Sequence, residues 1–435
     1  MAVDVIVGLQ RGDEGKGRFV DMLAAEHDIV ARFNGGPNAG HTVVLPEGKE
    51  LKLHGIPSGI GYPGKLNVIG DGEFIDAVKL CAEIDYLEVK DVPVSPDNLL
   101  ISSSSHLILP HHIVQDMRRE SGEQGQGSTK AGIAYVDADF ALREGARAEI
   151  INNDPDELAK KIIQGLYDMG RLTSGEQKAL GADTKTDITD KYVEDASKLG
   201  PFVTDTMLFL NNALDQDQSI LAEGAQAFLL DKYQGMWPNV TSSITTSGGV
   251  SPGLGVAPHH IDKVIGVFKA IHSHVGGGHF VTEIDDKEQL NQLHGNPDAG
   301  DAERGTTTGR LRRLGHLDIP VLRRANIANG TTELAVTKLD WLSRYGETIL
   351  VCTGYKRKGK NLTTAPNAEY KLMQSEPIYE EISGWDENIS EMRDFRELPS
   401  NARDYVHILE DKLEVPITRI GVGPRRDQVI IRGAA

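Results

Sequence analysis

The chain has 435 residues, and 39% of them are hydrophobic, so it can bury a large core. Its 46 basic and 64 acidic residues give a net charge of -18, which argues against nucleic acid or an acidic membrane as a partner because like charges repel. It has two cysteines, Cys81 and Cys352, no signal-peptide pattern, and no apolar run of the roughly 20 residues that span a membrane. We therefore expect a cytoplasmic protein of a reducing compartment, without a disulfide framework.

A glycine-rich segment follows the first predicted strand. Residues 3–7 are an apolar run typical of a buried strand, residues 18–27 have helical spacing, and Gly-Leu-Gln-Arg-Gly-Asp-Glu-Gly-Lys-Gly lies between them at 8–17. This order is that of a phosphate-binding loop, in which backbone N–H groups and Lys16 bind phosphate oxygens. Gln10 replaces the first glycine of the common pattern, and Gly17 replaces the Ser or Thr that binds Mg²⁺. Asp13 is therefore the expected metal ligand. The alternative interpretation of the whole segment is an ordinary solvated, glycine-rich turn.

The remaining elements alternate between strands and helices. Short apolar runs predict buried strands at 29–34 and 66–70, then at 219–222, 263–271, 334–337 and 348–352, with a closing β pair at 417–421 and 428–431. Helices are expected at 106–119, 156–169 and 187–198, with a polar connector at 171–186. The alternation predicts an α/β fold with a large, mostly parallel central sheet flanked by helices, in a single main domain over 1–435 that carries a helical insertion at about 107–200.

A second glycine-rich loop follows the strand at 29–34. It reads Asn-Gly-Gly-Pro-Asn-Ala-Gly-His-Thr from Asn34 to Thr42, and it places His41 where an acid, or a donor to a developing oxyanion, could act. Taken alone, His41 would be interpreted as a surface histidine, but together with the first loop it is a candidate catalytic residue.

These two loops resemble those of the adenylosuccinate synthetase family, which joins L-aspartate to IMP at the expense of GTP, and the resemblance extends from residue 3 to about residue 432. It implies that Asp13 removes the proton from purine N1, and that His41 stabilises the 6-oxygen as it attacks the γ-phosphate to give 6-phosphoryl-IMP. It also implies that Asp13 and the backbone carbonyl of Gly40 hold Mg²⁺. The implied GTP-binding residues are Gly12, Asp13, Glu14, Gly15, Lys16, Gly17, Arg312, Lys338, Leu339, Asp340, Gly421, Val422 and Gly423.

The expected guanine-binding part lies at about 330–432. Thr337-Lys338-Leu339-Asp340 follows an apolar strand and resembles an element that reads guanine, because the Asp340 carboxylate can accept from both N1–H and the 2-amino group. A surface Lys–Asp pair is the alternative. The family's usual serine is Gly421 here, which removes one hydroxyl from the expected base site.

The expected L-aspartate site is the hydroxyl- and guanidinium-rich segment 305–313. Arginine forks match carboxylates, and the acidic net charge argues against the competing interpretation as an RNA contact. The resemblance implies that Arg310 also lies near the ribose and Arg312 near GTP. The implied aspartate-binding residues are Thr306, Thr307, Thr308, Gly309, Arg310 and Arg312.

The IMP site draws on several segments. The implied residues are Asp13, Lys16, Asn38, Ala39, Gly40, His41, Thr129, Arg143, Gln226, Thr241 and Arg310. The resemblance implies that Arg143 crosses from a partner subunit, so a homodimer is expected.

Three segments depart from the resembled family. Arg11 stands where the family usually has tryptophan, and the stretch 128–135 is shorter than the family's, at the border of the monophosphate site. His272-Ser273-His274 with His279 suggests a metal site superficially, but we expect a loop near the aspartate site because no fourth ligand is evident.

Two competing functions are weighed against the ligase that makes adenylosuccinate. A related ligase could act on another 6-oxopurine nucleotide such as dGMP, but such relatives replace the loop aspartate, and Asp13 is kept. A GTP-binding regulatory switch would need a hydroxyl-held magnesium and offers no reason for the Thr/Arg segment at 305–313.

Overall fold

The structure is a computed structural model that describes residues 2–45, 48–123, 125, 127–274, 276–295 and 311–433. Its centre is a ten-stranded sheet with the order β18-β17-β13-β9-β1-β8-β2-β5-β6-β7. All neighbours in this sheet are parallel except the pair β17–β18, which confirms the expected mostly parallel α/β sheet. The strands are β1 (Val3–Gly8), β2 (Ile29–Arg32), β5 (Leu66–Ile69), β6 (Leu99–Ser102), β7 (Val203–Thr204), β8 (Ile220–Glu223), β9 (Ile261–Lys269), β13 (Glu333–Thr337), β17 (Ile417–Gly421) and β18 (Val429–Ile431).

Strand β1 lies in the middle of the sheet, between β8 and β9. Val3, Val5, Ile6 and Val7 are completely buried, because helices cover both faces of the sheet. On one face, Ile6 packs with α1; on the other, Val5 and Val7 belong to the cluster that holds α9, α10 and α12. The helices around the sheet are α1 (Lys16–Ala24), α2 (Ala77–Val89), α9 (Thr206–Asp215), α10 (Val250–Leu254), α12 (Ile319–Asn329) and α14 (Ser400–Leu413).

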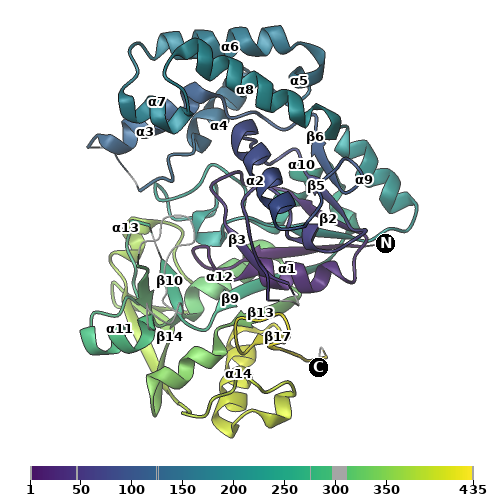
Figure 1. The fold of residues 1–435 in the computed structure, drawn as a ribbon. Coiled ribbons are helices and arrows are strands. Elements are labelled where there is room, and N and C mark those ends of the chain that lie inside the picture. Colours follow the sequence, from purple (N-terminus) through teal and green to yellow (C-terminus); the bar gives the residue numbers. More distant parts are fainter. Residues whose placement is uncertain are drawn as a thin grey trace.

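A group of helices lies in the chain between β6 and β7 and forms a layer beyond one end of the sheet (Figure 1). Its apolar side chains, among them Leu158, Ile162 and Leu166 of α6, form one cluster with residues of α2 and of the strands β5 and β6. The predicted helices are present, but the predicted connector at 171–186 is wrong, because it contains α7. The Thr173 side chain and the Glu176 side chain cap the first turn of α7 reciprocally, a signal that the sequence analysis overlooked. These helices are α3 (Pro110–Ser121), α4 (Ile133–Leu142), α5 (Ile150–Asn153), α6 (Pro155–Asp168), α7 (Ser174–Leu180) and α8 (Lys185–Leu199).

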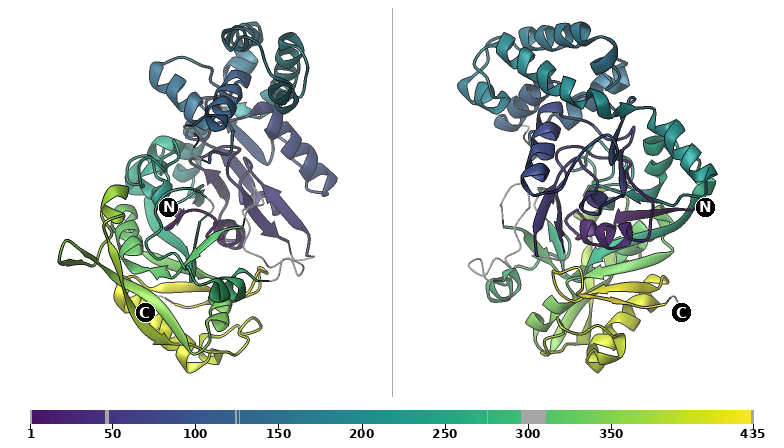
Figure 2. Two further views of the ribbon diagram at one scale, coloured as in Figure 1. Left: turned by 90° about the vertical axis from the view of Figure 1, so that its left-hand side faces the viewer. Right: turned by 45° about the vertical axis from the view of Figure 1, so that its right-hand side comes forward.

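Smaller sheets lie outside the central one. In one of them β14 pairs antiparallel with both β15 and β16, and a green hairpin of this part of the chain projects in the left-hand view (Figure 2). The predicted strand at 348–352 is part of β14, but β14 pairs with β12, β15 and β16 and not with the central sheet. The remaining elements are β3 (His41–Val44), β4 (Glu50–Leu53), β10 (His272–His274), β11 (Arg313–Gly315), β12 (Leu317–Asp318), β14 (Thr348–Arg357), β15 (Lys360–Leu362), β16 (Glu376–Ser383), α11 (Lys287–His294) and α13 (Glu369–Leu372). Within the described residues, no helix is both long and apolar enough to cross a membrane.

Candidate active site

The loop between β1 and α1 winds through the left-handed region of the backbone. Gly12 has φ 91°, Asp13 has φ 60° and Gly15 has φ 85°. For Asp13 this conformation is strained, which is common at functional sites. The winding turns the buried Glu14 side chain inward, where its Oε1 accepts from the N–H groups of Gln10 at 3.2 Å and of Gly12 at 2.8 Å. The Glu14 side chain therefore stabilises the loop from inside. Only the backbone of Glu14 remains for the predicted contact with GTP.

Lys16 opens α1 and is tied to the same bracing carboxylate. Its Nζ lies 2.9 Å from Glu14 Oε2 and 2.5 Å from the carbonyl of Gln226. Gly8 leaves the space for this arrangement, because a Cβ there would lie 2.4 Å from Glu14 Oε2. Contacts within the protein thus hold the ammonium group at the helix N-terminus.

Gly17 explains one departure from the common phosphate-loop pattern. A Cβ at this position would lie 3.0 Å from the Cβ of His41 and 3.4 Å from the Oγ of Ser58. The missing Ser or Thr hydroxyl is therefore the consequence of packing the β3 histidine directly against the loop helix. This close contact joins the two segments that the sequence analysis singled out.

His41 forms a buried dyad with Glu223, the last residue of β8. The His41 Nδ1 lies in hydrogen-bond contact with Glu223 Oε1, and Ser58 donates to the same carboxylate from Oγ at 2.7 Å and from its backbone N–H at 2.8 Å. Burial raises the pKa of Glu223, but His41, Arg32 and the Ser58 N–H outweigh it and lower that pKa overall. Burial lowers the pKa of His41, against the opposing effect of Glu223. The resting pair is therefore a neutral imidazole that donates Nδ1–H to a carboxylate, which leaves Nε2 as the reactive nitrogen.

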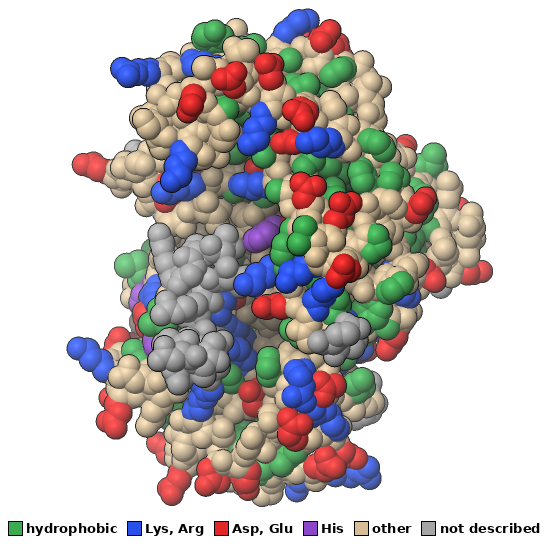
Figure 3. Space-filling view, viewed as in Figure 1, with side chains coloured by type: hydrophobic (Ala, Val, Ile, Leu, Met, Phe, Trp, Pro, Cys, Tyr) green, Lys and Arg blue, Asp and Glu red, His purple; other side chains and the backbone are tan. Residues whose placement is uncertain are grey.

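One cavity of about 420 Å³ is lined by most of the predicted site residues that the structure describes. Figure 3 shows Lys and Arg side chains around the hollow in the middle of the face seen in Figure 1. The cavity is lined by residues from the phosphate loop, from the second glycine-rich loop and from several later segments of the chain. The predicted residues among them are Gly12, Asp13, Gly15, Lys16, Gly17, Asn38, Ala39, Gly40, His41, Thr129, Gln226, Thr241 and Arg312.

Asp13 and Arg312 meet across this cavity. Arg312 donates to Asp13 Oδ2 from Nη2 at 2.7 Å and from Nε at 3.1 Å, and the Asp13 side chain remains 31% exposed. Asp13 and Gly40, the two residues expected to hold Mg²⁺, both line this cavity. The predicted residues Thr306, Thr307, Thr308, Gly309 and Arg310 lie outside the described residues.

The side of the cavity that we expect to bind the monophosphate is held by Asp116, a residue that the sequence analysis missed. Asp116 is buried in α3 and accepts from Ser128 Oγ at 2.8 and 2.9 Å and from the N–H of Gly132 at 2.9 Å. These bonds fix the shortened segment that carries Thr129 into the cavity wall. Arg143 is exposed and does not line this cavity, so its role at a partner subunit's site stays a prediction.

The predicted guanine-reading residues lie together, beside α1 and outside the cavity. Thr337 Oγ1 donates to the carbonyl of Glu14 at 2.7 Å, which couples the end of β13 to the phosphate loop. Arg18, also missed from the sequence, donates to the carbonyls of Gly423 and Gln428. Burial raises the pKa of the nearby Asp340 carboxyl, an effect that Lys338 and Arg18 oppose.

The glycine at 421 is explained by the same contacts. A Cβ there would lie 3.0 Å from Arg18 Nη1, so the guanidinium occupies the space that a serine side chain would need. The side chain of Leu339 is completely buried in the core, so its predicted contact with GTP is open only to its backbone. Val422 is likewise buried.

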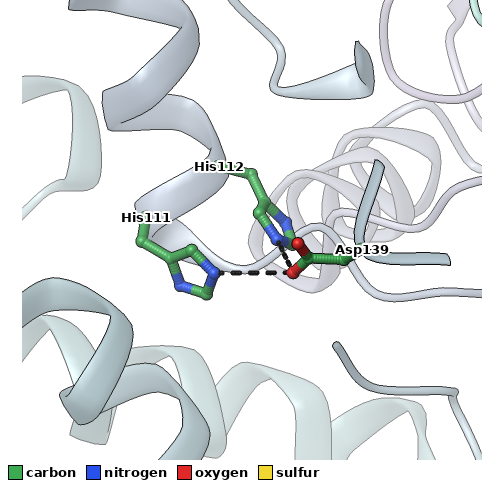
Figure 4. Close-up of side chains that lie close together, drawn as sticks. All are labelled: His111, His112 and Asp139. Carbon is green, nitrogen blue, oxygen red and sulfur yellow. Dashed lines mark hydrogen bonds and ion pairs between the residues drawn. The ribbon is translucent and has the colours of Figure 1, made fainter. Parts of the chain in front are cut away.

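The histidines at 272–279 do not form a three-ligand metal group among the residues described; His111, His112 and Asp139 do (Figure 4). However, His112 Nδ1 accepts from the backbone N–H of Leu109 at 3.0 Å, so His112 Nε2 must carry the proton that it donates to Asp139 at 2.8 Å. A protonated nitrogen cannot bind a metal. The group therefore serves to dock α4 on α3, and Arg143 is the residue that ends α4.

Comparisons with known proteins agree along the whole chain. Residues 5–430 match the family model described as adenylosuccinate synthetase. The adenylosuccinate synthetase of Halothermothrix orenii is 43% identical over 440 residues, and that of Caldanaerobacter subterraneus is 43% identical over 435 residues; each alignment covers 99% of both chains. The fully ligated adenylosuccinate synthetase of Plasmodium falciparum superposes with a TM-score of 0.88 at 35% identity and full coverage of both chains. The succinoaminodeoxyadenylate synthetase of cyanophage S-2L has the same fold, with a TM-score of 0.61 at 18% identity over 100% of this chain and 96% of that one. The chain therefore belongs to the adenylosuccinate synthetase family.

Proposed function

We propose that the cavity between the two glycine-rich loops carries out both steps by which this ligase makes adenylosuccinate from IMP, L-aspartate and GTP. The observation that carries the proposal is that Asp13, Lys16 and His41 line one cavity, with His41 backed by a buried carboxylate. These residues are a base, a phosphate-binding cation and a donor, which is the set that phosphorylation of a lactam oxygen requires.

In the first step, Asp13 removes the proton from N1 of IMP, and the electron pair moves to the 6-oxygen. His41 takes up a proton from water at Nε2 and donates a hydrogen bond from this nitrogen to the 6-oxygen, and the negative charge of Glu223 stabilises the imidazolium. The 6-oxygen attacks the γ-phosphorus of GTP, and the bond from that phosphorus to the β-phosphate oxygen breaks. GDP is the leaving group, and 6-phosphoryl-IMP is the intermediate that remains for the second step. Lys16 and the loop N–H groups hold the phosphates in position.

In the second step, the amine of L-aspartate attacks C6 of the phosphorylated purine. Phosphate leaves and takes the 6-oxygen with it, and the attacking amine loses a proton, so the product is adenylosuccinate. We propose that the segment containing Thr306 to Arg312 binds the carboxylates of L-aspartate, because the described part of that segment, Arg312, already reaches Asp13.

Mg²⁺ fits this site through oxygen donors, namely the carboxylate of Asp13 and the carbonyl of Gly40. When bound, the ion would neutralise negative charge between the phosphates. For guanine we propose Asp340 as the acceptor from N1–H and the 2-amino group, with Lys338 and Gly421–Gly423 beside the base.

We further propose a homodimer in which Arg143 reaches the partner subunit's IMP. Two observations support this role: Arg143 is exposed at the C-terminal end of α4, and it does not line the cavity of its own subunit. Both cysteines are free and buried, which supports activity in the reducing cytoplasm.

The test is phosphate release by the purified protein with GTP, IMP, L-aspartate and Mg²⁺, with each component omitted in turn. Release that needs all three substrates supports the proposal. Turnover with dGMP and none with IMP would refute it in favour of the related ligase, and GTP hydrolysis independent of aspartate and purine would favour a regulatory switch. Replacing GTP by ATP in the same assay measures the role proposed for Asp340.

A further inference from the structure

Arg11 is a buried cation in the wall of the active-site cavity. Its side chain follows Gln10 in the phosphate loop, and the residue is only 8% exposed. Nη2 donates to the carbonyl of His279 at 2.6 Å, while Nε is buried without a hydrogen-bond partner among the residues that the structure describes. Burial, with Arg313 adding to it, lowers the pKa of Arg11 to about 10, so the group is still charged at neutral pH.

The carboxylates whose charge acts on Arg11, those of Asp318 and Glu369, accept hydrogen bonds from other groups. Asp318 accepts from Tyr355 Oη at 2.5 Å and from the N–H of Val321 at 3.2 Å. Glu369 accepts from Asn239 Nδ2 at 2.9 Å and from the N–H of His279 at 2.8 Å. They act on Arg11 through electrostatic attraction alone, without a hydrogen bond.

Three other cations in or near the cavity wall have a carboxylate partner. Lys16 is paired with Glu14 and Arg312 with Asp13. Arg313, which lies 5.5 Å from the centre of the same Phe280 ring as Arg11, is paired with Glu283. Within the described part of the chain, Arg11 has no such partner. A buried guanidinium without an anion is costly, and an anionic ligand in the adjoining cavity would remove that cost.

The position of Arg11 distinguishes between the three anionic substrates. GTP phosphates belong on the N–H groups of the loop and on Lys16, and the IMP phosphate on the side of Thr129. The Arg11 side chain instead reaches away from both, to His279 and Phe280, and shares Phe280 with the end of the expected aspartate segment at Arg313. Gly276 and Gly277, which have no side chains, line the same cavity as Arg11.

We propose that Arg11 is a further substrate-binding residue of the ligase and binds one carboxylate of L-aspartate. This inference rests on the proposed function. It assigns a role to a position at which the chain departs from the tryptophan of the family it resembles.

The experiment compares steady-state kinetics of the full chain with those of Arg11→Met and Arg11→Lys. Arg11→Met is expected to raise KM for L-aspartate by about 10- to 100-fold, the ratio for one lost charge-assisted hydrogen bond, with the KM values for IMP and GTP changed less than about threefold. Arg11→Lys, which keeps the charge, is expected to recover part of the loss. Competitive inhibition by succinate should weaken in parallel, because succinate presents the same two carboxylates without the amine.

Arg324→Met is the control. Arg324 is half-buried, but like Arg11 it donates to a backbone carbonyl and has a buried Nε without a hydrogen-bond partner among the described residues, and it lies outside the cavity. This substitution should leave all three KM values unchanged. An unchanged KM for L-aspartate in Arg11→Met, or an equal rise in all three KM values, would overturn the inference. Absence of adenylosuccinate formation by the unmodified chain would instead refute the proposed function.

Discussion

The substitution Glu223→Gln tests the dyad that we assign to phosphoryl transfer. The change keeps the shape of the side chain, and the amide oxygen can still accept from the N–H of Ser58, as Glu223 does at 2.8 Å. It removes the negative charge next to His41 Nδ1, where the protonated imidazole must form during catalysis. Hydrogen bonds to charged groups contribute about 1.5–3 kcal/mol, and each 1.4 kcal/mol corresponds to about tenfold in rate. We therefore expect kcat to fall by about 10- to 100-fold.

The same substitution predicts a shift in the pH profile. Glu223 raises the pKa of His41 against the lowering effect of burial, so its loss lowers that pKa further. Because the donor must be protonated, the alkaline limb of kcat should move to lower pH. Ser58→Ala removes a hydroxyl donor, 2.7 Å from the carboxylate, but leaves the charge, and should cost less than about tenfold. A Glu223→Gln enzyme with unchanged kcat and an unchanged alkaline limb would refute this assignment.

Three further substitutions test other parts of the account. Gly17→Ser places an atom about 3.0 Å from the Cβ of His41, so it should lower kcat by at least about tenfold while KM for GTP changes little, as steady-state assays would reveal. Asp340→Asn should raise KM for GTP by about 10- to 100-fold and admit xanthosine triphosphate, whose 2-oxo group can accept from the amide; unchanged base selectivity would contradict the assigned guanine site. Burial lowers the pKa of His316 to about 4, whereas the pKa of an unfolded histidine is about 6.5. As the pH falls, the unfolded chain therefore binds a proton before the folded chain does, and the folded state loses stability between about pH 6.5 and pH 4. His316→Phe should reduce the decrease of Tm over that pH range, and His259→Asn, at an exposed histidine, should not. Equal pH dependence of Tm in the two variants would show that burial of His316 is not the cause.

The sequence predicted the central sheet well because its strands are buried on both faces. Four of the five residues from Val3 to Val7 are apolar and completely buried, Asp4 being the exception, and such runs are visible without tertiary information. The helix α7 was missed because its signal is a local cap, Thr173 with Glu176, and not an apolar stripe. The strand β14 was predicted, but its sheet was not, because strand pairing depends on contacts far apart in sequence.

The site residues were predictable where a motif carries them and were missed where only packing does. Asp13 and His41 stand in glycine-rich loops of recognisable order, and the structure places both on one cavity. Glu223 is 182 residues from His41, and its role becomes visible only when β8 lies next to the loop. The reasons for Gly17 and Gly421 are likewise steric: each leaves room for a side chain from a distant segment.

The central claim is that the 6-oxygen of the purine attacks the γ-phosphate and later leaves with it. The most direct measurement supplies IMP that carries a heavy oxygen isotope at position 6, together with GTP and L-aspartate, and determines by mass spectrometry where the isotope ends. If the 6-oxygen is phosphorylated, the isotope appears in the released inorganic phosphate. Unlabelled phosphate, with the isotope recovered in water, would contradict the account.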